Sequence, residues 1–153
     1  MVEKNTDELE KVLKNTRIGK ASDFLAENRE SMMDSERAFY DHIKKITQKN
    51  SILLQKVFLD ADIPERYGYK LVSGEKHTKQ RDIILHICYA SGMTLEETQH
   101  ALALYGMPQL YARLSRDAVL IICFNERPGS ILDVNEYLKK NKLKPLRTSG
   151  TQE

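Results

Sequence analysis

The sequence predicts an all-α protein, because chain breakers are few, strand patterns are scarce and helix-forming residues fill the segments between the breakers. The chain has 153 residues with only four prolines and seven glycines. Apolar residues recur at helical spacing, as in Phe39, Ile43 and Ile46, whereas alternation of apolar and polar residues is hard to find. A hydrophobic content of 41% is enough for one domain with a core.

Charge and cysteine content narrow the classes of protein that fit. The 24 basic and 22 acidic residues leave a net charge of +2, so a nucleic-acid surface would have to be local rather than a basic coat. Two cysteines do not make a disulfide framework. The N-terminus is polar, and no apolar run approaches the roughly 18 residues of a membrane helix. We therefore expect a soluble, cytoplasmic protein that does not enter the membrane.

The N-terminal third predicts a polar arm and then a firmer helix. Residues 6–14 place Leu9, Val12 and Leu13 on one helical face, and residues 20–33 carry a second short amphipathic pattern. We expect residues 1–34 to form a helical arm that docks loosely. The firmer helix begins after Ser35.

Two short helices and a tight turn are expected next. Residues 52–61 form a short apolar helix that ends at the turn Asp62-Ile63-Pro64. Pro64 disfavours helical conformation in the residue before it and suits the first turn of a helix. The following helix, 64–73, is ended by Gly74 and leads into a polar connector.

A repeat accounts for the rest of the chain. "RDIILHICYA" at 81–90 returns as "RDAVLIICFN" at 116–125. Each copy is followed by a helix start with a capping box, Thr94 with Glu97 and then Ser130 with Asp133. We expect two successive helical hairpins. The run "AVLIICF" alone could also be a buried strand, but the matched flanks favour a helix.

The repeat could instead be a doubled catalytic signature. Cys88 and Cys123 sit in apolar helices without a C-x-x-C partner, so we expect buried core residues rather than reactive thiolates. An aspartate in the first turn of a helix is favoured by the helix dipole, and each arginine could pair with a neighbouring helix or reach outward. The four histidines form no metal pattern, and known catalytic motifs are absent. We expect no enzyme and no cofactor.

The order of helices from 36 to 106 resembles the Cro/repressor-type (λ-repressor-like) DNA-binding domains, also called the xenobiotic-response-element family. The resemblance lies in "LLQKVFLDADIPERYGYKLVSGEKHTKQRDIILHICYASGMTLEET", slightly under half of the chain, and "GMTLEE" is its most specific part. It implies a five-helix helix-turn-helix fold and a bacterial-type transcription regulator. The family usually has a small residue where Phe58 stands, glycine at Asp62 and a β-branched residue at Gly68.

The resemblance also implies which residues would contact duplex DNA. The recognition helix would be 64–73, with Glu65, Arg66, Tyr69 and Lys70 as candidates for base contacts. Phosphate contacts would come from basic residues around it. These candidates are Lys56, Lys76, Lys79 and Arg81. Repressors of this kind commonly act as dimers on paired half-sites, so a homodimer is possible.

A second reading is a non-catalytic protein-interaction module on a degenerate helix-turn-helix fold. Tyrosines are favoured at interfaces, although they are also common in cores. The tyrosines concerned are Tyr67, Tyr69, Tyr105 and Tyr111. Either reading divides the chain into an arm (1–34), a helix-turn-helix domain (35–107), a C-terminal hairpin packed on it (108–145) and a disordered tail (146–153).

Overall fold

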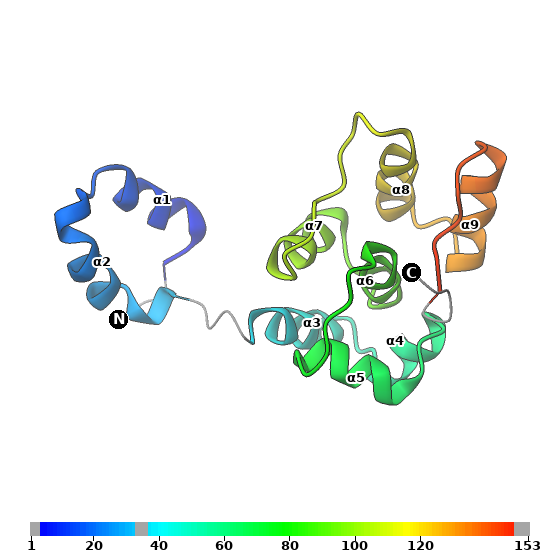
Figure 1. Ribbon diagram of the computed structural model, residues 1–153, viewed down its shortest axis with the longest axis horizontal. Helices are drawn as coiled ribbons and strands as arrows, with labels where there is room; N and C mark the ends of the chain where they lie inside the picture. Colours follow the sequence, from blue (N-terminus) through cyan, green and yellow to red (C-terminus); the bar gives the residue numbers. More distant parts are fainter. Residues whose placement is uncertain (1–3, 33–36, 149–153) are drawn as a thin grey trace. The chain divides into compact units, whose positions relative to one another are not determined.

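The computed structural model describes residues 4–32 and 37–148, and these residues form nine α-helices and no strand (Figure 1). The prediction of an all-α protein is confirmed for this part of the chain. Two compact units are present, Met1–Asp34 and Ser35–Glu153. Each is described separately below.

The N-terminal unit consists of short helices around a very small core. Its elements are α1 (Thr6–Lys14), the 3₁₀ turns η1 (Ile18–Lys20) and η2 (Arg29–Ser31), and α2 (Ala21–Glu27). Phe24 and Asn28 are buried. The Asn28 amide donates to the Phe24 carbonyl at 2.8 Å and accepts from the Lys4 ammonium at 2.6 Å. No residue of α1 is buried, so hydrogen bonds hold this unit more than a core does.

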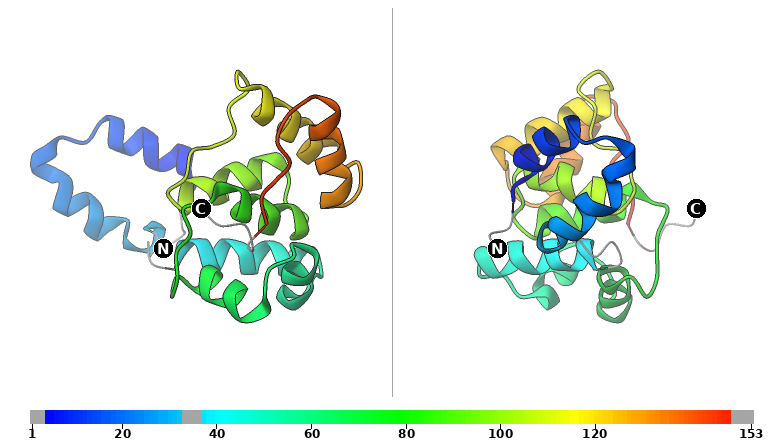
Figure 2. Two further views of the ribbon diagram at one scale, coloured as in Figure 1. Left: turned by 45° about the vertical axis from the view of Figure 1, so that its right-hand side comes forward. Right: turned by 90° about the vertical axis from the view of Figure 1, so that its left-hand side faces the viewer.

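The second unit is built around one central helix. Its helices are α3 (Ala38–Lys49), α4 (Leu54–Asp60), α5 (Glu65–Ser73), α6 (Arg81–Ala90), α7 (Leu95–Leu104), α8 (Ser115–Glu126) and α9 (Ile131–Lys140). Every residue of α6 from Asp82 to Tyr89 is buried. Helices α4, α7 and α9 pack against α6, and α3 packs against α5 and α7 (Figure 2). An apolar helix covered on all sides is the expected centre of a helical core.

Local sequence signals account for the helix boundaries. The Thr94 and Glu97 capping box begins α7, and Ser130 with Asp133 forms the same kind of box before α9. Gly74 ends α5 with φ of 87°, a left-handed conformation that glycine adopts without strain. The "AVLIICF" run lies inside α8, so the helical reading of that segment is confirmed.

The two copies of the repeat are joined by exchanged ion pairs. Arg81 at the start of α6 binds Asp117 of α8 (Nη2 to Oδ1, 2.6 Å), and Arg116 of α8 binds Asp82 of α6 (Nη2 to Oδ2, 2.8 Å). Each arginine also approaches two backbone carbonyl oxygens about thirty residues further along its own copy. The exchange makes the hairpins α6–α7 and α8–α9 two halves of one structure.

The segments that follow the two hairpins repeat the same contacts. Leu110 after α7 and Leu146 after α9 are both buried. The backbone N–H of Leu110 donates to Gln99 Oε1 at 2.7 Å, and that of Leu146 donates to Asn135 Oδ1 at 2.8 Å. Both pairs of positions differ by 36 residues, so the repeat extends beyond the helices into the segments that leave them.

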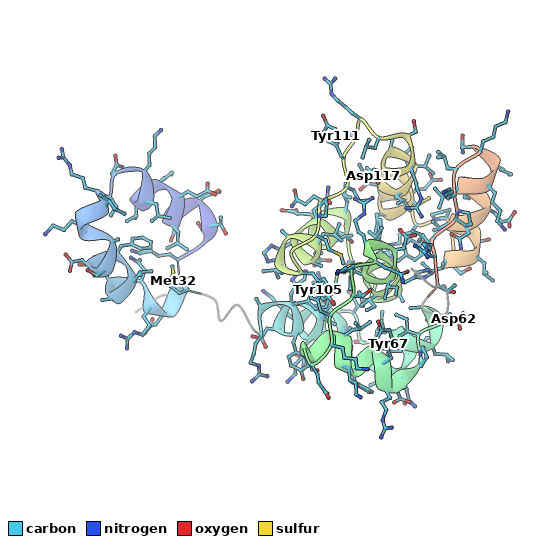
Figure 3. The ribbon with its side chains drawn as sticks, in the orientation of Figure 1. Met32, Asp62, Tyr67, Tyr105, Tyr111 and Asp117 are labelled. Atoms are coloured by element: carbon cyan, nitrogen blue, oxygen red, sulfur yellow. The ribbon has the colours of Figure 1, made fainter. Side chains whose placement is uncertain are left out.

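The C-terminal segment is ordered further than expected. The backbone N–H of Arg147 donates to Asp82 Oδ2 at 2.9 Å, as that of Tyr111 does to Asp117 Oδ2 (Figure 3). The disordered tail predicted from residue 146 therefore does not hold for Leu146 and Arg147, because a buried side chain and a buried carboxylate hold them. Residues 149–153 lie outside the described residues.

Candidate nucleic-acid interface

The turn between α4 and α5 requires one left-handed residue, and Asp62 supplies it. Asp62 has φ of 56°, a conformation that aspartate and asparagine tolerate better than most residues. Ile63 is buried, and its N–H donates to the Phe58 carbonyl at 2.9 Å. Aspartate can therefore stand where the resemblance leads one to expect glycine, and the chain reverses between two short helices.

The unusual residues Phe58 and Gly68 fit each other where α4 and α5 meet. A Cβ atom built on Gly68 would lie 2.5 to 2.7 Å from three atoms of the Phe58 ring. Phe58 is almost fully buried, so its ring has little freedom to move away. The large residue on α4 thus takes the place of the missing side chain on α5. Helix α5 runs unbroken from Glu65 to Ser73, so the distortion that a central glycine suggested is absent.

The four base-contact candidates lie on α5 and differ in freedom. Glu65, Arg66 and Tyr69 are exposed and Lys70 is half-buried. The Tyr69 ring packs edge-on against the Phe58 ring with centroids 5.0 Å apart. Within the described residues, neither Arg66 nor Lys70 has an ion pair. The two cations are the candidates best placed to reach a ligand.

Arg81 and Lys56 have partners within the chain. Arg81 forms the ion pair with Asp117 described above, and its side chain is only 22% exposed. The expectation that Arg81 contacts phosphate is therefore not carried forward, because its guanidinium closes the repeat. Lys56 pairs with Asp60 at 3.1 Å on the same face of α4, where both side chains are exposed.

The connector after α5 is anchored between two exposed lysines. The His77 ring stacks on Tyr105 with centroids 4.2 Å apart, and the Thr78 N–H donates to the Tyr105 hydroxyl at 2.9 Å. Lys76 and Lys79 flank this anchor and are exposed. Figure 3 shows Tyr105 in the interior of the unit, to which the connector is attached. Segment 64–79 carries four lysines or arginines and two glutamates, a modest local excess of positive charge.

The cysteines are buried, as their apolar context predicted. Cys88 lies in α6 and Cys123 in α8, and both are free thiols. Burial raises the pKa of the Cys88 thiol to about 12, and burial together with Glu126 raises that of Cys123. Among the described residues, no group of three or more histidine, cysteine or acidic side chains is arranged to hold a metal ion.

Sequence reasoning overlooked a cleft of about 440 Å³ beside the turn. Its wall includes Asp62 from the turn, His86 from α6 and Ile131 from the start of α9. One signal for this site was available in the sequence. His86 stands where the second copy of the repeat has Ile121, so an imidazole replaces an apolar side chain at a matched position.

The chain matches no protein-family model, no curated protein and no solved structure. Function must therefore be argued from the geometry alone. Within residues 4–32 and 37–148, no helix combines the length and the apolar character needed to span a bilayer.

Proposed function

We propose that the protein binds duplex DNA through α5 and acts as a transcription regulator with a λ-repressor-like helix-turn-helix. The observation that carries the proposal is the pairing of α4 with α5 across the Asp62 turn, with Phe58 filling the space above Gly68. This close crossing holds α5 firmly while its outer face stays exposed. A helix held in this way can enter the major groove with its N-terminal residues toward the base edges.

The side chains on the outer face of α5 suit base recognition. Arg66 lies in the first turn of α5 and Lys70 one turn later, so both project from neighbouring positions on the helix. Arginine and lysine bind the O6 and N7 acceptors of guanine, and a glutamate such as Glu65 can accept from cytosine N4. Tyr69 is held by Phe58 and would contribute apolar contact.

Lys76 and Lys79 would set the position of the protein on the DNA. Both are exposed on a connector that His77 and Thr78 attach to Tyr105. A cation on a fixed segment can meet a phosphate without ordering a loop first, which lowers the entropic cost of binding. Phosphate contacts of this kind contribute affinity and register rather than sequence preference. A second copy bound to a neighbouring half-site would complete the interface.

Selection from a randomised duplex pool tests the proposal. A preferred sequence should emerge, and Arg66→Ala with Lys70→Ala should weaken binding to it by at least about 30-fold, because each base contact contributes roughly 1–3 kcal/mol. The matched control is Lys139→Ala with Lys140→Ala, which removes the same charge from exposed positions on α9. The control should bind within about threefold of the unchanged protein.

Two outcomes would refute DNA recognition. One is a selection that enriches no sequence, with only weak attraction that disappears at physiological salt. The other is an equal loss of affinity in both double variants, since that would mean that total charge rather than the face of α5 governs binding. Thermal unfolding of each variant shows whether the fold is retained.

A protein partner is the second candidate, and exposed leucines favour it. Leu53 (74% exposed), Leu59 (77%) and Leu132 (76%) expose most of their surface to solvent. Exposed apolar side chains that gather in one region commonly mark interaction sites. On this reading Leu59→Asp would abolish capture of a cognate protein at a salt concentration that removes nucleic acid, whereas Arg66→Ala with Lys70→Ala would not affect it.

A further inference from the structure

The cleft beside the α4–α5 turn is bounded by three parts of the second unit. Asp60 and Asp62 form one side, His86 and Tyr89 of α6 lie on another, and the α8–α9 connection with the start of α9 closes the third. Its volume of about 440 Å³ is within the range of small-molecule sites. The cleft thus joins the proposed DNA-binding turn to the second hairpin of the repeat.

His86 brings an unsatisfied hydrogen-bond acceptor to this wall. Its side chain is 3% exposed. The ring Nε2 lies 2.9 Å from the Arg147 carbonyl oxygen, which can only accept, so Nε2 carries the proton. Nδ1 is then an acceptor, and it is buried without a hydrogen-bond partner. A buried polar atom without a partner costs about 1–3 kcal/mol, and such atoms commonly point to a missing water or ligand.

The repeat shows that the helical hairpin does not need this imidazole. The residue matched to His86 in the second copy is Ile121, in an otherwise similar apolar helix. The flanking Ile87-Cys88 pair is kept as Ile122-Cys123. A histidine has therefore replaced an apolar residue in the copy that borders the cleft, and no packing requirement common to both copies explains it.

The charges around the cleft favour a cationic ligand. Asp60 and Asp62 contribute two carboxylates to its wall. Arg127 is the cation on the opposite side, but its guanidinium already donates to the Tyr89 carbonyl oxygen at 2.6 Å and to that of Met93. The Tyr89 ring and Ile131 supply apolar surface. A ligand with N–H donors, a positive charge and an apolar body would match these groups.

We infer that this cleft binds a small organic cation, an amine or amidine on an apolar body, that donates an N–H hydrogen bond to His86 Nδ1. The carboxylates of the turn attract the charge, and Tyr89 with Ile131 contacts the body of the ligand. Regulation of DNA binding follows from the same geometry and rests on the proposed function. A ligand that contacts Asp62 bears on the residue that sets the angle between α4 and α5.

Benzamidine is a suitable probe, and benzoate is its control because the two have the same ring and opposite charge. Binding is followed at pH 7.5 by the ¹⁵N resonances of the histidine side chains in the full chain. Millimolar benzamidine should shift the His86 Nδ1 resonance saturably, while benzoate should leave it unchanged. His86→Ile, which installs the residue of the second copy, should weaken benzamidine binding at least tenfold by calorimetry. Asp62→Asn keeps a residue that tolerates positive φ and should weaken it several-fold.

Three results would overturn the site. They are no shift of His86 with either probe, which would mean that a water molecule alone satisfies Nδ1; equal binding of benzamidine and benzoate; and undiminished binding to His86→Ile. The regulatory step is read separately, as a several-fold change in affinity for the selected duplex when benzamidine is added. If no duplex is bound at all, DNA recognition fails while the titration of His86 still decides the cleft.

Discussion

Arg81 and Asp117 lie 36 residues apart in the sequence and meet through two hydrogen bonds, Nη2 to Oδ1 at 2.6 Å and Nη1 to Oδ2 at 3.2 Å. Asp117 is almost completely buried, and Arg116 with Asp82 forms the same arrangement in reverse. Two paired carboxylates thus hold the repeats together. A buried charge is tolerated only when paired and hydrogen-bonded, so each pair should be sensitive to the loss of one partner.

Asp117→Asn should therefore destabilise the protein by about 3 kcal/mol, because Arg81 would keep its charge without the carboxylate that balances it. Urea unfolding measures the change. Asp60→Asn is the matched control, since Asp60 pairs with Lys56 on an exposed face of α4. That exposed pair should contribute less than about 1 kcal/mol. Equal effects of the two substitutions would contradict the view that the exchanged pairs hold the repeats together.

Gly68→Ala should destabilise the protein by about 2 kcal/mol even though alanine favours helices. The new methyl group would collide with the Phe58 ring, and overpacking of a core costs about 1–3 kcal/mol. Phe58→Leu should relieve the collision, so the double variant should lose less stability than the sum of the single ones.

Gly19→Ala serves as the control for that cycle, because nothing lies within 4 Å of a Cβ at this position. It should change stability by no more than about 0.5 kcal/mol. Additive effects of Gly68→Ala and Phe58→Leu would show that the two residues do not limit each other.

Stability should fall as the pH drops below about 6.5. Burial lowers the pKa of His86 and of His42 from 6.5, more than the carbonyl hydrogen bonds and nearby carboxylates raise it. The unfolded chain therefore takes up these protons first, and stability present above pH 6.5 is lost as the pH falls through the folded pKa values. The urea midpoint should be lower at pH 5.5 than at pH 7.5. In His42→Gln with His86→Ile this difference should be much smaller.

A further loss is expected under acid conditions. Burial would raise the pKa of Asp82, but hydrogen bonds from Arg116 and the Arg147 backbone and the charge of Arg116 lower it below 3.8. Stability that depends on this carboxylate is present above pH 3.8 and disappears as the pH falls through the lower folded value. A midpoint that rises between pH 4 and pH 2 would contradict the sign of this shift.

Both cysteines should resist thiol reagents in the folded protein. Reaction needs the thiolate, and burial raises the pKa of Cys88 to about 12 and also raises that of Cys123. Ellman's reagent at pH 8 should leave both thiols unmodified in buffer and modify both in urea. Rapid modification of either thiol in buffer would reopen the catalytic reading of the repeat.

The sequence carried enough information to predict every short-range feature of the second unit. The capping boxes of Thr94 and Ser130 each involve a residue three positions away, and the α-helical state of 115–126 follows from its matched copy. Neighbouring residues on a helix do not face each other, so Arg81 could not pair with Asp82. The sequence left open whether Arg81 reached outward or across to another helix.

What the sequence by itself determined is the helical class, the doubling of one hairpin and the burial of its apolar face, because these depend on spacing and on contacts within a few residues. Tertiary structure alone decided that Arg81 binds Asp117 instead of pointing outward, that Phe58 compensates for Gly68, and that Leu146 and Arg147 belong to the fold. It also placed His86 against the turn. Each of these depends on which distant segments meet when the core forms, and that depends on the packing of whole helices.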